Sequence, residues 1–301
     1  MLSESAALFA GIDAGGSHCR VRLEDEAGKL LGEGHAGAAN LGLGWSQVEA
    51  NVCRALNAAL QQTGLDSNAY GRLHVGAGFA GAHLAGLKAT AVKWQHPFAS
   101  WNVTTDLHAA CYGAHGGEPG SVIILGTGFS AIGLTEQGET LLGGYGFPIN
   151  AVCSGSGLGL QAVQAVLLAL DGLAPATRLS RLLQQHFNGG AALMAEQLLQ
   201  ATPQQYAELA PLVFQAADSG DSVAVAMLQQ AVSFIEQLSL QLPEGRSCLL
   251  GGVGQRLLTY LPPAQRSRFD PPLAAATVGA IYYARHQLAL AKQEIKRHGA
   301  D

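Results

Sequence analysis

The chain has 301 residues, of which 48% are hydrophobic and 13% are charged, and its net charge is −5 with a pI near 6.0. This composition supplies enough apolar side chains for packed cores and excludes a disordered chain. Because there is no basic block, the sequence argues against nucleic acid or an anionic membrane as the main partner. The length predicts two domains.

The first part of the chain alternates expected strands and helices. Apolar runs that end in turns predict strands, and apolar residues that recur every three or four positions predict helices. The expected strands are 6–12, 19–23, 30–34, 73–76 and 98–105, and the expected helices are 47–63, 84–92 and 107–114. Such a mixture is typical of an α/β domain.

The same order of strand, glycine turn, strand, turn and strand restarts at Ser121. The expected strands are 121–125, 131–135, 139–142 and 247–250, and the expected helices are 158–170, 178–187, 192–199, 204–217, 221–242 and 277–296. The repeat predicts an internal duplication. We expect two α/β halves that face each other across a central cleft, each with a glycine turn of a size that suits phosphate.

The cysteines and the N-terminal residues indicate in which cellular compartment the protein is expected. The five cysteines are odd in number and form no CxxC pair, so we expect neither a disulfide framework nor a zinc knuckle. A reducing cytoplasm fits this pattern. Residues 1–13 contain Glu4, no basic segment and only a short apolar run, which predicts neither a signal peptide nor a membrane span.

The motif GIDAGGS at 11–17 ends an expected strand on Asp13 and continues into a glycine turn. Backbone N–H groups of Gly15, Gly16 and Ser17 could approach the β- and γ-phosphates of a nucleotide. Asp13 could hold Mg²⁺, directly or through water. The alternative is an ordinary hairpin turn capped by the aspartate, and the second glycine turn at 126–128 favours the phosphate interpretation.

Asp106 follows the expected strand 98–105 and precedes the second glycine turn. It could be the N-cap of the next helix, or a general base that takes the proton of an attacking hydroxyl. The G-x-G-x-x-G at 76–81 resembles a dinucleotide fingerprint, but it follows a later strand of the pattern, whereas such a fingerprint follows the first. The nearest downstream acid is Asp106. That acid lies farther off than the roughly 20 residues expected for a ribose contact.

Taken together, the motifs resemble the acetate-kinase/hexokinase/actin-like ATPase superfamily, which includes BadF/BadG-type ATPases, and within it the N-acetylglucosamine kinase and bacterial glucosamine kinase group. The segments that carry the resemblance are GIDAGGS at 11–17, GAANL at 37–41, HPFAS at 96–100, TTD at 104–106, PGSVIILGTGFS at 119–130, GGYGFP at 143–148, LLALDG at 167–172 and SCLLGGVG at 247–254. The resemblance implies duplicated ribonuclease-H-like domains at 1–117 and 118–301, with a final helix that can pack back on the first domain.

The resemblance also implies roles for individual residues. Asp106 would be the general base and a sugar ligand, and Ser17 and Thr127 would contact the phosphates of ATP. The glycines expected around the nucleotide are Gly15, Gly16, Gly126, Gly128, Gly220, Gly251 and Gly252. The residues expected around the sugar are Asn40, Phe129, Ser130, Gly144, Tyr145 and Gly146.

The implied function is ATP- and Mg²⁺-dependent phosphorylation of the 6-hydroxyl of an amino sugar, by a cytoplasmic protein for which a homodimer is the expected assembly. Relatives carry an Asp where this chain has Ala151, which puts the choice of sugar in doubt unless Asn150 substitutes. Two alternatives are left open. One is an ATPase activator of an acyl-CoA dehydratase, and the other is a catalytically weak, sugar-binding regulator.

Overall fold

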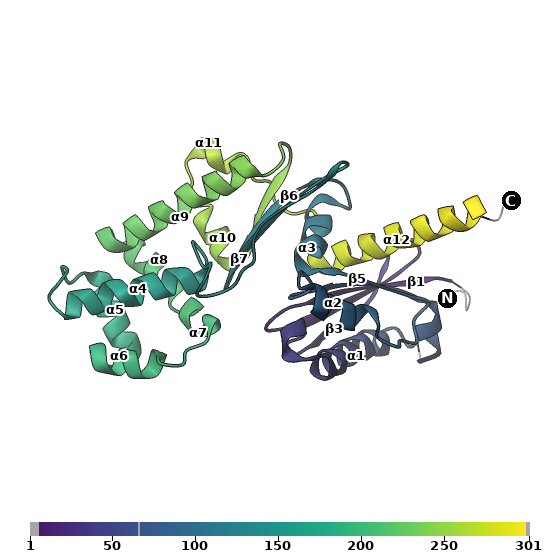
Figure 1. Cartoon of the computed structure of the whole chain (residues 1–301), viewed down its shortest axis with the longest axis horizontal. Coiled ribbons are helices and arrows are strands. Elements are labelled where there is room, and N and C mark those ends of the chain that lie inside the picture. The colour runs from purple at the N-terminus through teal and green to yellow at the C-terminus, as the bar shows by residue number, and fades with distance from the viewer. Residues whose placement is uncertain (1–5, 66, 299–301) are drawn as a thin grey trace. The chain divides into compact units, whose positions relative to one another are not determined.

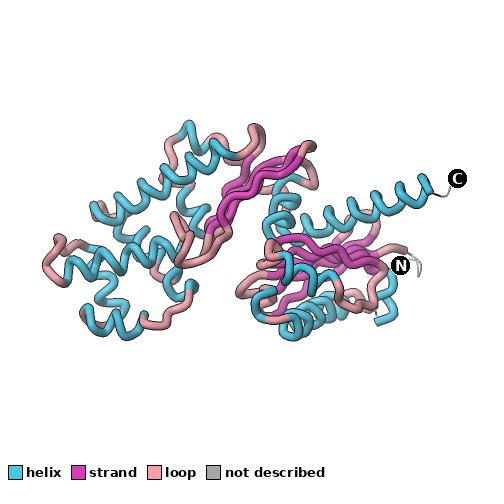
Figure 2. Tube along the Cα trace, viewed as in Figure 1, coloured by secondary structure: helices cyan, strands magenta, loops and turns pink. Residues whose placement is uncertain are grey.

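The computed structural model describes residues 6–65 and 67–298, which form two compact α/β units. Unit 1 contains the described residues up to Gly120 and those from Pro272 onward, and unit 2 is Ser121–Pro271. The chain therefore leaves unit 1 once and returns to it once. Figure 2 shows that each unit has its own sheet, drawn in magenta, covered by helices in cyan. The expected mixed α/β fold with two sheets is confirmed.

Unit 1 has a five-stranded sheet with the order β3-β2-β1-β4-β5. The first three strands form an antiparallel meander, and β4 and β5 continue parallel to β1. The strands are β1 Leu8–Ala14, β2 Cys19–Asp25, β3 Leu30–Ala36, β4 Leu73–Phe79 and β5 Ser100–Thr105. The helices are η1 Leu41–Leu43, α1 Trp45–Gln61, η2 Ser67–Arg72, α2 Ala85–Val92, α3 Asp106–His115 and α12 Ala276–His298.

Helix α12 returns to unit 1 and packs along β1, β4 and α3 (Figure 1). Two glycines in the sheet allow this close approach. A Cβ on Gly11 would lie 1.8 Å from the carbonyl oxygen of Thr277, and one on Gly76 would lie 1.9 Å from that of Ala280. Any side chain at these positions would push the helix off the sheet. The first glycine of the 76–81 motif therefore has a packing reason that involves no dinucleotide.

Unit 2 has a four-stranded sheet with the order β8-β7-β6-β9, in which β9 pairs with β6 in parallel. The strands are β6 Gly120–Leu125, β7 Phe129–Thr135, β8 Gly138–Gly143 and β9 Ser247–Leu250. The helices are α4 Gly155–Leu170, α5 Arg178–Phe187, α6 Ala191–Leu198, α7 Pro203–Ala207, α8 Ala210–Asp218, α9 Ser222–Gln241, α10 Gly252–Leu257 and α11 Pro263–Arg266. Both sheets thus place their strands in the order third, second, first, fourth, which is the repeat that the sequence predicts.

One expected helix, 204–217, is instead two helices, α7 and α8. Pro211 lies at the start of α8. Proline has no backbone N–H, and its ring clashes with the carbonyl four residues earlier, which here belongs to Ala207. The chain therefore ends one helix at Ala207 and starts another, and this break shapes the wall of the pocket in unit 2.

Helix α9 is the one helix among the described residues that is long and apolar enough to cross a membrane, with a mean hydropathy of 1.3. Its buried side chains recur at helical spacing and belong to the core of unit 2. They are Ala224, Met227, Leu228, Ala231, Ile235 and Leu238. One apolar stripe of this kind is typical of a core helix.

Candidate active site

The carboxyl ends of the parallel strands β1, β4 and β5 meet at one edge of the unit 1 sheet. Asp13 in β1 pairs in register with Gly78 in β4, and Phe79 pairs with Thr105 in β5. Asp106 follows directly after Thr105. The two carboxylates expected from the sequence therefore flank the end of β4, which lies between β1 and β5, at the edge where open α/β sheets bind their ligands.

Asp106 is the first residue of helix α3, and Thr105 is its N-cap. The Thr105 hydroxyl accepts a hydrogen bond from the backbone N–H of His108 at 3.1 Å, so the alternative that Asp106 caps the helix is wrong. One oxygen of the Asp106 carboxylate accepts the N–H of Leu107 at 2.9 Å, which orients the group. Because Thr105 does the capping, the carboxylate is available for chemistry.

Gly78 sets how closely helix α3 approaches the sheet. A Cβ on Gly78 would lie 2.6 Å from the Cβ of Ala109 and 3.3 Å from the Cα of Asp106. The glycine is therefore what allows the first turn of α3, and with it Asp106, to lie on β4. Gly81, the last glycine of the same motif, has a φ of +88° in the turn after β4. All three glycines of the 76–81 motif thus serve packing or turn geometry.

Burial raises the pKa of Asp106 above its ordinary value. The Leu107 N–H opposes this shift, the negative charge of Asp13 adds to it, and the imidazole of His83 lowers the pKa again. Burial also raises the pKa of Asp13, against the opposing charge of Arg20, whose guanidinium lies 3.9 Å away and is largely exposed. Buried carboxylates with raised pKa values at one edge of a sheet are a common feature of catalytic sites.

Main-chain hydrogen bonds stabilise the glycine turn after β1. The N–H of Gly15 donates to the carbonyl of His18 at 2.9 Å, and the N–H of Ala39 donates to the carbonyl of Gly15 at 3.0 Å. A Cβ on Gly16 would meet no atom within 4 Å. Asn40 lies next to this turn, where its side-chain oxygen accepts the N–H of Gly42 at 2.7 Å. Neighbouring atoms therefore leave the space above Gly16 open.

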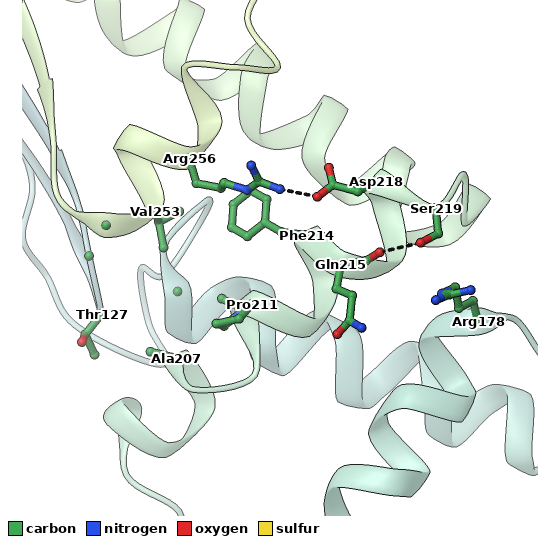
Figure 3. A pocket seen from close by; sticks show the side chains of 14 residues that line it. Thr127, Arg178, Ala207, Pro211, Phe214, Gln215, Asp218, Ser219, Val253 and Arg256 are labelled. Atoms are coloured by element: carbon green, nitrogen blue, oxygen red, sulfur yellow. Dashed lines mark hydrogen bonds and ion pairs between the residues drawn. The ribbon is translucent and has the colours of Figure 1, made fainter.

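Unit 2 contains a pocket of about 810 Å³ between the β6–β7 turn and helices α8 and α10 (Figure 3). Its lining comes from the turn, from the start of α4 and α5, and from one face each of α7, α8 and α10. The residues are Gly126, Thr127, Gly155, Arg178, Ala207, Ala210, Pro211, Phe214, Gln215, Asp218, Ser219, Gly252, Val253 and Arg256. A volume of this size accommodates a nucleotide.

One end of the pocket is the turn Gly126–Thr127–Gly128, joined to the start of helix α4. The N–H of Gly155 donates to the carbonyl of Gly126 at 2.7 Å, and the hydroxyl of Ser156 donates to the carbonyl of Thr127 at 2.7 Å. The Thr127 hydroxyl donates to Gln204 at 2.8 Å. The N-terminus of a 16-residue helix thus lies beside the turn, where its dipole favours an anion.

The glycines at this end are not required by the fold. A Cβ on Gly126, Gly128 or Gly252 would meet no atom within 4 Å, and none of the three has a positive φ. Gly251 differs, since it has a φ of +83° and its Cβ would lie 2.3 Å from the carbonyl oxygen of Leu125. Gly251 is therefore a packing residue, whereas the other three leave room for a ligand to approach the backbone.

The opposite end of the pocket was missed by sequence reasoning. Phe214 and Asp218 on α8 and Arg256 on α10 line it, whereas Gly220, expected there from the sequence, follows α8 outside the lining. Arg256 is ion-paired with Asp218 and lies over the Phe214 ring at 5.6 Å. A lone Phe, Asp and Arg on separate helices give no local pattern, so no sequence signal could have identified them.

Of the residues expected around the sugar, Asn40 and Asp106 lie in unit 1, and the others lie on β7 and in the segment after β8. The Phe129 ring is buried and packs edge-on against Phe234 at 5.2 Å, so its backbone is the part left for a ligand. Tyr145 is 73% exposed. Ala151 is buried, and the side-chain oxygen of Asn150 is buried without a hydrogen-bond partner in the described part of the chain. Such an oxygen is costly unless a ligand satisfies it.

Comparison with known proteins gives consistent matches. A model of the BadF/BadG/BcrA/BcrD ATPase family matches residues 10–261. The glucosamine kinase GspK of Vibrio cholerae is 35% identical over 279 residues, which cover 92% of this chain and 95% of that kinase. A structure of a proposed N-acetylglucosamine kinase from Chromobacterium violaceum is 34% identical, with a TM-score of 0.85, and covers 93% of this chain and 99% of its own. A ROK family glucokinase from Streptomyces griseus, solved with glucose and AMPPNP, shares the fold at 17% identity and a TM-score of 0.54, over 93% of this chain and 100% of its own.

Proposed function

Because the chain belongs to the BadF/BadG/BcrA/BcrD ATPase family, we propose that it is an ATP-dependent amino-sugar kinase that phosphorylates the 6-hydroxyl of glucosamine or N-acetylglucosamine. The observation that carries the proposal is the match with a glucosamine kinase over nearly the full length of both chains. The arrangement of side chains at the sheet edge and in the pocket supplies the chemistry that the reaction needs.

Asp106 is the proposed general base. It lies at the carboxyl edge of the sheet, is oriented by the Leu107 N–H and has a raised pKa, so it accepts a proton more readily than an exposed aspartate. Its carboxylate takes the proton of the sugar hydroxyl as that oxygen attacks the γ-phosphate of ATP. The proton then resides on Asp106, and the negative charge of the transferring group passes to the product phosphates.

The nucleotide is proposed to bind in the pocket of unit 2. Its phosphates would lie on the Gly126–Gly128 turn, where Thr127, the start of α4 and the open glycines favour an anion. In the glycine turn of unit 1 the Gly15 N–H already donates to the carbonyl of His18, so Gly16 and Ser17 would supply the further backbone N–H groups to the β- and γ-phosphates. In this proposal the base belongs to unit 1 and the nucleotide pocket to unit 2.

The side chains of unit 1 are compatible with Mg²⁺. This ion usually takes one or two carboxylates together with substrate phosphates and water, and no cluster of three acidic, histidine or cysteine residues is needed. Within the described residues no such cluster occurs, while Asp13 presents one carboxylate at the edge of the sheet. We therefore propose Asp13 as the residue that holds Mg²⁺, directly or through water. When bound, the ion neutralises charge on the transferring phosphoryl group.

The sugar site is proposed to include Asn40, Asp106, the backbone at Phe129 and Ser130, and the exposed segment Gly144–Gly146. Asn150 is a further candidate, because its buried, unpaired oxygen could accept a hydrogen bond from a sugar hydroxyl. It would then replace the Asp that relatives carry at position 151. The cytoplasmic location, the homodimer and the cleft between the two units stay predictions.

The dehydratase-activator alternative is disfavoured by the cysteines. An iron–sulfur cluster needs deprotonated, accessible thiols. Cys111 is buried and donates to the carbonyl of Gly120 at 3.4 Å, and burial raises the pKa of Cys153 to about 12. The weak-regulator alternative differs from the kinase only in turnover, so activity decides between them.

The deciding experiment is a coupled ADP-release assay with glucosamine, N-acetylglucosamine and glucose, run with and without Mg²⁺. We expect ADP release that depends on an amino sugar and on Mg²⁺, together with a phosphorylated sugar detected by mass spectrometry. Release of ADP that is independent of every sugar would contradict the proposal and favour an ATPase. Sugar binding without turnover would favour a regulator.

A further inference from the structure

Helix α7 is a five-residue helix of unit 2 to which the proposed reaction assigns no role. Its start is fixed by a reciprocal pair of hydrogen bonds, a capping box. The backbone N–H of Gln205 donates to the Thr202 hydroxyl at 3.3 Å, and the backbone N–H of Thr202 donates to the Gln205 side chain at 2.9 Å. The last residue of the helix, Ala207, lines the pocket of unit 2 (Figure 3). An ordered element therefore lies beside the proposed nucleotide site.

Helix α7 packs closely on α4 (Figure 1). A Cβ on Gly159 of α4 would lie 1.9 Å from the carbonyl oxygen of Tyr206, and a Cβ on Gly155 would lie 3.0 Å from the Cβ of Ala207. These two glycines let the backbones of the helices approach each other. Because a close-packed contact transmits small displacements, α7 and the start of α4 should move together.

One end of α7 contacts the Gly126–Gly128 turn, which we call the phosphate turn. The Thr127 hydroxyl donates to the Oε1 atom of Gln204 at 2.8 Å. A threonine hydroxyl has one proton, so this hydroxyl must leave the amide oxygen before it can donate to a phosphate. An amide also carries N–H donors, and after turning over it can donate to the Thr127 oxygen. Gln204 can therefore hold the Thr127 side chain with or without a nucleotide.

Another side chain of α7 contacts the segment 143–148, which carries the GGYGFP motif. The ring centre of Tyr206 lies 5.0 Å from that of Phe147, with an angle of 34° between the planes. Three glycines of the segment have positive φ values, and Tyr145 is 73% exposed. A segment with so little burial depends on the contacts at its edge for its order. The pair of rings supplies such a contact with α7.

We propose that helix α7 couples the phosphate turn to the segment 143–148, with Gln204 and Tyr206 as the positioning residues. A nucleotide at the turn fixes Thr127, and Gln204 follows it. A fixed α7 then presents Tyr206 to Phe147 and orders the segment. The first ligand thus orders what the second ligand needs, so each strengthens the binding of the other.

The inference rests on the proposed function in two assumptions: that the phosphate turn binds the nucleotide and that the segment 143–148 contributes to the sugar site. It adds a physical connection between these two sites within unit 2. The connection can be tested without a sugar, because it predicts that a change in the segment alters nucleotide binding.

The first test is calorimetric binding of Mg²⁺-ADP to the full chain, without sugar. Gln204→Met keeps the length of the side chain and should weaken ADP binding about fivefold, the effect of one lost neutral hydrogen bond. Phe147→Ala lies outside the pocket lining and should weaken it about threefold, because α7 loses an aromatic partner. The double variant should bind ADP like Gln204→Met alone, since both changes break one connection.

Matched variants control for general damage. Gln164 is an exposed glutamine on α4 outside the pocket lining, and Gln164→Met should leave ADP binding unchanged. Tyr206→Phe keeps both rings and should bind ADP as the wild type does. Thermal unfolding without ligand checks that each variant is folded. Wild-type ADP affinity in folded Gln204→Met would overturn the inference, and so would independent effects that multiply to about 15-fold in the double variant.

The second test repeats the ADP titration with a saturating amount of the amino sugar that supports ADP release. We expect the sugar to strengthen ADP binding about threefold or more in the wild type and to have no such effect in Gln204→Met. A wild type without this gain, or a variant that keeps it, would overturn the coupling.

The two tests separate this inference from the proposed reaction. If no sugar is phosphorylated but Gln204→Met and Phe147→Ala weaken ADP binding without adding to each other, the kinase reaction fails and the connection through α7 stands. If amino sugars are phosphorylated but Gln204→Met binds ADP like the wild type, the connection fails and the kinase reaction stands.

Discussion

Units 1 and 2 share a meander but differ in the segment that connects it to the fourth strand. In both, three antiparallel strands are joined by a fourth that pairs in parallel with the first, and a glycine turn comes after the first strand. In unit 1, residues 37–72 separate the meander from the fourth strand, whereas in unit 2 residues 144–246 do so. The long insertion of unit 2 supplies helices α4 to α9.

The two units also differ in the candidate functional groups that they carry. The first strand of unit 1 ends near a carboxylate, Asp13, and Asp106 lies at the same edge of the sheet. The first strand of unit 2 ends at Leu125 and Gly126, and its helices build a pocket instead. The shared scaffold thus gives each unit a glycine turn after its first strand. We propose that the other segments give unit 1 the general base and unit 2 the nucleotide pocket.

Asp106→Asn tests this division most severely. Loss of a general base is expected to lower kcat by about 10²–10⁴-fold, while ADP affinity, set by unit 2, stays unchanged. Thr127→Val is the matched change in the other unit, and it should weaken ADP binding with a smaller loss of kcat. Steady-state kinetics and calorimetry measure both. Near-normal turnover in Asp106→Asn would end the assignment of the base.

The same substitution has a stability consequence. Because burial raises the pKa of Asp106 in the folded state, its ionised form disfavours folding, and this cost is present above the folded pKa and absent below the ordinary value of 3.8. Asp106→Asn should therefore raise the unfolding temperature at pH 7 and lose that advantage below pH 3.8. Wild-type activity should also fall as the pH drops through the raised pKa. A thermal-unfolding series across pH checks the sign.

Substitution of glycines can distinguish positions that leave room for a ligand from positions that are needed for packing. Gly16→Ala introduces a methyl group into open space, so the fold should be unaffected while kcat/KM falls about tenfold, or about 1.4 kcal/mol in the barrier. Gly126→Ala should have the same effect if both turns contact the phosphates of the nucleotide. Turnover that survives in one variant and not in the other would show that the turns are unequal.

Gly78→Ala is the control for this pair. Its Cβ would lie 2.6 Å from the Cβ of Ala109, so the overpacked helix should cost about 1–3 kcal/mol of folding free energy. Urea unfolding measures the difference. Equal stability of the Gly16 and Gly78 variants would contradict the distinction between open and packed glycines.

The smallest expected effect concerns the sugar. Ala151→Asp introduces the carboxylate that the family resemblance implies at this position, next to the N-terminus of α4. One added hydrogen bond to a hydroxyl is worth about 1–3 kcal/mol at most. We expect the KM for the amino sugar to fall several-fold, with the KM for ATP unchanged. Asn150→Ala should raise the sugar KM if Asn150 substitutes for the missing carboxylate. An unchanged sugar KM in Ala151→Asp would dismiss the idea of an altered pocket.

Much of the fold could be predicted from local pattern. The family and the α/β class are confirmed, and most strands and helices lie within a few residues of their expected bounds, because buried strands that end in glycine turns give a clear sequence signal. The amino-sugar kinase prediction is supported by the glucosamine kinase relative. The break between α7 and α8 was missed although Pro211 was visible, because the apolar spacing continues across it.

The sequence by itself determined the two meanders, their glycine turns and the positions of Asp13 and Asp106, since each is encoded by neighbouring residues. Only the tertiary structure decided which glycines are required for close packing. Gly11, Gly78 and Gly251 are of this kind, because a Cβ on each would clash with an atom from a distant segment. It also decided that Thr105 caps α3. The end of the pocket lined by Phe214 and Arg256 was decided by packing alone, because these two residues meet only when α8 and α10 fold against one core.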